Sequence, residues 1–173
     1  SYSDFSSRLS RGRTYARNGS VVDLLLTRGR IDAVVAGSMA YDVAITIAAL
    51  PPRAWRAIKA DCATSIGSLV DLLSGRLADD VMRRLARPGD GMFPGPREVT
   101  LKCSCPDGAQ FCKHLAAVFY AIGNRLDTRP ELLFLLRGVD QTELVAAATK
   151  ESVSRAVRGD AAHALADGDL AGI

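Results

Sequence analysis

Three cysteines and one histidine fall close together, with the spacing Cys-x-Cys, six residues, Cys-x-His: Cys103, Cys105, Cys112 and His114. Three thiols and one imidazole are the donor set of a closed, tetrahedral zinc site. We therefore predict that these four residues bind one structural Zn2+ ion. A group of buried thiols beside a hydrogen-bonded histidine is one alternative, since cysteine is often buried without a metal. A disulfide is the other alternative, although a Cys-x-Cys loop is tight and strained.

The surrounding sequence predicts how the ligands are positioned. Cys103 and Cys105 lie two apart on a predicted strand, so both sulfurs should leave the same face. A turn at residues 106–108 should follow, because proline, aspartate and glycine favour turns. Cys112 should then precede a helix, with His114 in its first turn. Apolar residues recur there with helical spacing: Leu115, Val118, Phe119 and Ile122.

Composition places the chain among globular proteins. Its 173 residues are 48% hydrophobic and 24% charged, with a formal net charge of +3. No apolar run approaches the roughly 20 residues of a membrane span. We therefore expect a cytoplasmic protein that does not enter a membrane.

Periodicity predicts an α+β fold, an antiparallel β-meander packed with helices, plus a small ββα zinc-finger module. A helix is expected over residues 5–17, and strands over 21–27, 31–36 and 41–47, the last with alternating apolar and polar residues. Helices should follow from Pro52, with Trp55, Ile58 and Cys62 on an inner face, then over 66–75 and 77–85.

These elements group into five predicted segments. Residues 1–86 form an α+β scaffold of a helix, a three-stranded meander and helices, and residues 87–97 form a linker rich in proline and glycine. Residues 98–126 form the zinc finger. Residues 127–150 form a C-terminal helical segment that packs on the core, and residues 151–173 form a tail.

The metal motif resembles the SWIM zinc finger, and the likeness extends over roughly residues 5–148. Similar segments flank the motif: Gly12-Arg13-x-Tyr15-Ala16-Arg17-x-Gly19, Gly37-Ser38, and the stretch from Leu132 to Gly138. The chain is thereby similar to bacterial SWIM zinc-finger proteins, which are often encoded beside a Swi/Snf-type helicase. The resemblance implies a role in nucleic-acid transactions, with DNA and such a helicase as candidate partners.

The ligand set also bears on catalysis. Four protein ligands leave zinc no open position at which to activate water, and we find no catalytic or phosphate-loop motif. We therefore predict a non-catalytic interaction module that binds DNA, a Swi/Snf-type helicase or both, without a small-molecule substrate. The candidate nucleic-acid contacts are basic residues of the first helix and of the metal motif: Arg8, Arg11, Arg13, Arg17, Lys102 and Lys113. A solvated helix face is the alternative interpretation of these arginines.

Two other functions fit the same residues. A pure protein–protein adaptor would expose an apolar patch, around Met92–Phe93 or Leu132–Leu136. A redox switch would release zinc when Cys103 and Cys105 are oxidised.

Overall fold

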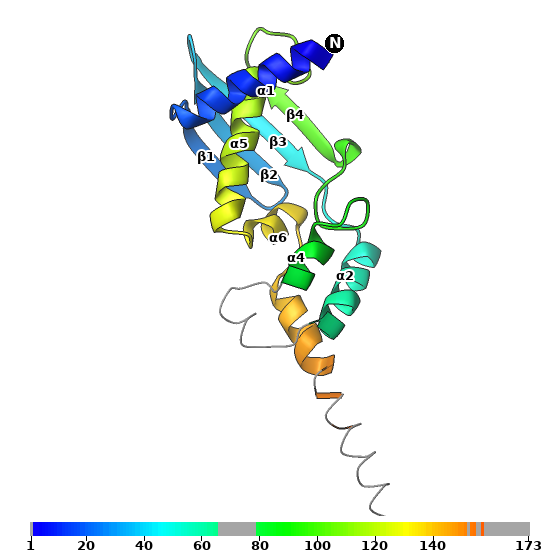
Figure 1. The fold of residues 1–173 in the computed structure, drawn as a ribbon. Coiled ribbons are helices and arrows are strands. Elements are labelled where there is room, and N and C mark those ends of the chain that lie inside the picture. The colour runs from blue at the N-terminus through cyan, green and yellow to red at the C-terminus, as the bar shows by residue number, and fades with distance from the viewer. Residues whose placement is uncertain (1, 66–78, 152, 155–156, 158–173) are drawn as a thin grey trace, which may run out of the picture. The chain divides into compact units, whose positions relative to one another are not determined.

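The computed structural model describes residues 2–65, 79–151, 153–154 and 157 (Figure 1). The chain divides into two compact units. The first is Ser1–Leu50 with Met92–Val139, and the second is Pro51–Gly91 with Asp140–Ile173. The helix expected over 66–75 and most of the tail expected over 151–173 lie outside the described residues. The five-segment division of the chain stays a prediction.

A four-stranded antiparallel sheet forms the centre of the first unit. Its strands follow one another in sequence order: β1 (Val21–Thr27), β2 (Arg30–Ala36), β3 (Ala40–Ile47) and β4 (Val99–Cys103). The predicted α+β fold with an antiparallel meander is therefore confirmed. The strand that enters the metal motif is the fourth strand of the same sheet. It pairs with β3 so that Cys103 lies opposite Val43 and Val99 lies opposite Ile47.

Helices cover one face of this sheet, where α1 (Tyr2–Arg17) and α5 (Lys113–Thr128) lie across the strands and α6 (Leu132–Arg137) follows (Figure 1). Strand β3 alternates as predicted, and β2 alternates as well. The side chains that they turn toward the helices are buried and apolar: Ile31, Ala33, Val35, Tyr41, Val43 and Ile45. The core of the unit therefore lies between the sheet and α5.

Helix α1 packs on α5 at unusually short range. A Cβ atom added to Gly12 would lie 2.3 Å from the Cβ of Ala116 and 2.9 Å from the backbone nitrogen of Ala117. Only glycine allows this approach, because real Cβ contacts are almost never shorter than 3.0 Å. The lack of a side chain at Gly12 therefore allows α1 to pack closely against α5, the helix that carries His114.

The apolar stripe of α5 is partly as predicted. Leu115, Val118 and Ile122 are buried, but Phe119 is 39% exposed, so its assignment to the core face was wrong. Helix α5 has to contact both the sheet and α1, and the small residues Ala116 and Ala117 occupy the additional buried positions. Phe119 therefore lies at the edge of the buried face of α5. The spacing of apolar residues in the sequence does not reveal how wide that face is.

The second unit is helical. It contains α2 (Pro52–Ser65), α4 (Asp79–Leu85) and a further helical stretch over residues 142–151. The predicted inner face of α2 is confirmed, since Trp55, Ile58 and Cys62 are buried. The Trp55 indole donates to Glu143 Oε2 at 3.1 Å and ties α2 to that stretch.

None of the helices within the described ranges combines the length and the apolar character that crossing a membrane requires.

Candidate metal centre

The structure brings together the four residues that the spacing singled out. One ligand atom from each of Cys103, Cys105, Cys112 and His114 lies within 4.8 Å of all the others. Cys103 ends β4, Cys112 is the residue at the N-cap of α5, and His114 lies in the first turn of that helix. Cys105 was predicted to lie on the same strand, but β4 ends at Cys103 and the chain bends at Cys105. One ligand thus comes from the end of the strand, one from the bend after it and two from the start of the helix.

The distances between donor atoms suit a tetrahedral zinc ion. The Nδ1 atom of His114 lies 3.8 Å from Sγ of Cys103 and 4.0 Å from Sγ of Cys112. Tetrahedral zinc, with bonds of about 2.3 Å to sulfur and about 2.0 Å to nitrogen, places such atoms about 3.5 Å apart. Shifts of a few tenths of an ångström therefore suffice to bring these donors to bonding distance. The thiol and imidazole donor set fits one zinc ion.

The start of helix α5 supplies a hydrogen bond to Cys112. The backbone N–H of Leu115 points at its sulfur, with an N to Sγ distance of 3.5 Å. Burial, with contributions from the two neighbouring thiols, raises the pKa of Cys103 to about 12. Zinc binds thiolates, so the metal has to displace a firmly held proton there.

Cys105 differs from Cys103. Burial acts to raise the pKa of its thiol, but the backbone N–H of Asp107 and hydrogen bonds from Cys103 and Cys112 outweigh burial, and the pKa is lowered. The thiols of Cys103 and Cys105 are therefore unequal before a metal binds. Cys105 is the easier thiol to ionise and Cys103 the harder one.

Aromatic rings orient the histidine. The Tyr41 ring stacks on His114 with a centroid distance of 4.4 Å, and the Tyr15 ring meets it edge-on at 5.7 Å. Gly37 leaves room for the stacked rings of Tyr41 and His114, since a Cβ atom there would lie 3.0 Å from Tyr41 and 3.3 Å from Nε2 of His114. Burial, and then the charge of Lys113, lower the pKa of His114 and favour the neutral form that binds metals.

Two further side chains hold the loops of the site. The backbone of Ser104 donates to the carbonyl of Asp42, and its hydroxyl accepts from the Asp42 N–H, both at 2.9 Å. Arg8 donates to the carbonyl of Phe111 at 3.1 Å and pairs with Asp107 at 3.6 Å. The sequence did not reveal Ser104 or Tyr41 as parts of the site, because their roles depend on the pairing between β3 and β4. Tyr15 and Gly37 could be found only through the resemblance.

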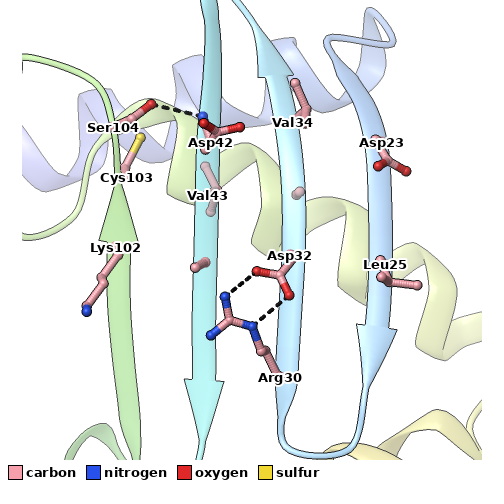
Figure 2. A pocket seen from close by; sticks show the side chains of 12 residues that line it. Asp23, Leu25, Arg30, Asp32, Val34, Asp42, Val43, Lys102, Cys103 and Ser104 are labelled. Carbon is pink, nitrogen blue, oxygen red and sulfur yellow. Dashed lines mark hydrogen bonds and ion pairs between the residues drawn. The ribbon is translucent and has the colours of Figure 1, made fainter.

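The six basic residues that were predicted to contact nucleic acid differ in their location and exposure. Arg11, Arg13 and Arg17 are exposed on α1. Arg8 is half-buried in its contacts to the ligand loop, and Lys113 lies over the Tyr15 ring at 5.5 Å. Lys102 emerges from the opposite, open face of the sheet (Figure 2).

That open face is not basic. Figure 2 shows Lys102 on the same face as Asp23, Asp32 and Asp42. Arg30 is paired with Asp32 through two hydrogen bonds of 2.6 and 2.7 Å. Phosphate contacts would therefore be more favourable on α1 than beside Lys102. Nucleic-acid binding by any of the six residues stays a prediction.

Four protein ligands, two buried and two partly exposed, are the donor set of a structural zinc centre of the zinc-finger class. Residues 85–123 match the family model of the SWIM zinc finger. This part of the chain is a SWIM zinc finger, and its Cys103, Cys105, Cys112 and His114 cluster fits one structural zinc ion. The chain therefore contains a zinc-binding interaction module of a kind that is usually non-catalytic.

The chain is also similar to a curated mycobacterial protein. It is 39% identical over 142 residues to "Uncharacterized protein Rv2102" of Mycobacterium tuberculosis. The match covers 80% of this chain and 51% of the relative, so the chain spans about half the length of that protein. No solved structure gave a significant match.

Proposed function

We propose that the chain is a non-catalytic, zinc-stabilised module for DNA transactions and that it contacts DNA through the exposed side of α1. The attachment of α1 to the metal centre is the observation that carries the proposal. Gly12 sets α1 against the ligand helix, and Arg8 joins α1 to the loop between the ligand pairs. The zinc ion thus holds an arginine-rich helix in a fixed place.

The exposed arginines of α1 supply the chemistry of this contact. Arg13 and Arg17 lie four residues apart and so share one side of the helix, and both are exposed, as is Arg11. A guanidinium group is always charged and matches the oxygens of a phosphate in a two-pronged geometry. The surface of α1 is accordingly suited to the DNA backbone and not to reading base sequence.

Salt-dependent binding tests the proposal. Binding of the zinc-loaded chain to a labelled duplex and to the matching single strand is measured by fluorescence anisotropy between about 50 and 200 mM salt. Reversing two charges, Arg13→Glu with Arg17→Glu, should weaken binding and reduce the slope of log K against log salt by about 2. Lys102→Glu, on the open sheet face, is the matched control for charge reversal and should have a smaller effect. Absence of binding at the lowest salt, or no change in the double variant, would refute DNA contact by α1.

A Swi/Snf-type helicase is the protein partner that we propose, on the strength of the resemblance. Tagged chain is purified from its native cell with and without nuclease. A helicase that stays bound after nuclease treatment contacts the chain directly. A helicase that is lost is bridged by DNA, and one that never co-purifies contradicts this part of the proposal.

A further inference from the structure

An apolar pocket of about 220 Å³ opens in the first unit, away from the zinc ligands. The inner face of the sheet, helices α5 and α6, and the segment at Phe93 form its walls. The residues that matter for its chemistry come from three of these parts: Phe93, Phe119, Gly123, Leu133 and Arg137. The proposed DNA contact on α1 uses none of them.

Gly123 is the first indication that the pocket has an occupant. It lies in the interior of α5 and lines the pocket, and a Cβ atom added there would meet no atom of the described part of the chain within 4 Å. Glycine destabilises a helix interior relative to alanine, and packing among the described residues does not require it here. Gly12 in α1 differs, because its lack of a side chain is needed for contact with α5. The open wall at Gly123 therefore leaves room for an atom from another molecule.

Arg137 is the second indication. Its side chain is 1% exposed, and it also lines the pocket. Nη1 donates to the carbonyl of Ala48 at 2.9 Å and Nη2 donates to Glu98 at 2.7 Å. Nε is buried and has no acceptor among the described residues. A buried donor without an acceptor is costly, and the complement of a cationic donor is an oxygen acceptor.

The size of the pocket and its rim indicate the class of occupant. Small-molecule sites usually enclose about 300–1,000 Å³, and this pocket is smaller, near the volume of one large side chain. Phe93 and Phe119 line it while remaining 56% and 39% exposed. A polypeptide would cover these rings with neighbouring residues, as buried aromatic anchors do at protein interfaces. We infer that this pocket binds one large apolar side chain of a protein partner, with a carbonyl of the partner accepting from Arg137. The inference holds whether or not α1 binds DNA.

Methyl NMR of the zinc-loaded full chain tests the inference. The probes are N-acetyltryptophanamide, which has a large ring and amide carbonyls, 3-methylindole, which has the ring alone, and N-acetylglycinamide, which has the carbonyls alone. N-acetyltryptophanamide should shift the methyl signals of Ile122, Leu133 and Leu136, whereas N-acetylglycinamide should not. It should also bind more tightly than 3-methylindole, since only the amide supplies an acceptor for Arg137.

Variants at the open wall provide the control. Gly123→Leu should fill the pocket and weaken N-acetyltryptophanamide at least about tenfold, whereas Asn124→Ala, on the same helix outside this pocket, should leave binding unchanged. Should Gly123→Leu fail to fold, Gly123→Ala adds a single methyl group and should still weaken binding. Shifts that are absent, or that persist unchanged in the Gly123 variants, would overturn the proposal. Equal affinity for 3-methylindole would overturn the role of Arg137. A concentration-dependent dimer that Gly123→Leu abolishes would overturn the partner assignment and make a second copy the occupant.

Discussion

Replacing Gly12 with alanine tests whether close packing fastens α1 to the zinc helix. The new Cβ atom would lie 2.3 Å from the Cβ of Ala116, whereas ordinary contact begins at 3.4 Å, so the shortfall is 3.4 − 2.3 = 1.1 Å. The opposing atoms are a short side chain and helix backbone, which cannot rotate out of the way. The two helices must therefore move apart by about the length of that shortfall.

The expected loss of stability follows from two opposing effects. Overpacking a close contact costs about 1–3 kcal/mol, and alanine recovers about 0.5–1 kcal/mol of helix propensity relative to glycine. The net change is a loss of about 0.5–2 kcal/mol. In a protein of this size each kcal/mol corresponds to a fall of about 2–4 °C in Tm.

Thermal and urea unfolding of the zinc-loaded chain provide the assay. Gly123→Ala is the matched control, because the same methyl group added there meets no atom within 4 Å and should raise stability by about 0.5–1 kcal/mol. The two substitutions should therefore shift Tm in opposite directions. A Gly12→Ala variant at least as stable as the parent protein would refute the close packing of α1 on α5.

Three further predictions concern the metal and the ion pair between the buried Arg137 and the partly exposed Glu98. Cys112→Ser should abolish stoichiometric zinc in elemental analysis and unfold the finger, because zinc contributes about 10–16 kcal/mol to the folding of such sites; zinc retained at one ion per chain would contradict this. Zinc affinity, measured by competition with a chelator, should rise with pH, because the Cys103 thiol, with a pKa raised to about 12, must lose its proton to bind; affinity independent of pH would contradict this. Glu98→Gln should cost about 1–3 kcal/mol at neutral pH, because the buried Arg137 guanidinium loses its charged acceptor. The hydrogen bond from Arg137 lowers the pKa of Glu98 below 4.5, so the ionised carboxylate stabilises the fold above that value and its contribution is lost as pH falls through the lowered pKa. The difference in unfolding free energy between the parent and Glu98→Gln should accordingly shrink as the pH is lowered into the acid range, and a difference that stays constant down to acid unfolding would be the contrary result.

The metal motif could be predicted from sequence because its information is local. All four ligands fall between Cys103 and His114, so ligand type and spacing were enough to group them and to place Cys112 and His114 at the start of a helix. Only Cys105 was misplaced, because β4 ends at Cys103. The meander was predictable for a similar reason, since neighbouring strands are joined by short turns such as the one at Gly29, whose φ is 68°.

Features that depend on distant contacts were not predictable. The pairing of β4 with β3 brings Ser104 to Asp42 and completes the surroundings of Cys103, yet residues 48–98 separate the two strands in sequence. The burial of Arg137 could not be inferred either, because arginine is usually exposed and its acceptors, Ala48 and Glu98, are remote in sequence. The placement of Phe119 depended on how α1 and the sheet divide the surface of α5 between them.

The ladder between β3 and β4 has a further consequence for chain topology. Ile47 and Val99 are register partners, and the Ala48 N–H donates to the Glu98 carbonyl at 2.8 Å just beyond them. The polypeptide thus departs from the sheet and rejoins it at adjacent points, so that everything between these points is an insertion at the tip of a β-hairpin. Closing so long a loop costs only modestly more entropy than closing a short one. Such a junction can accept inserts of very different length, while the cysteines and the histidine at the opposite end of β4 keep their positions.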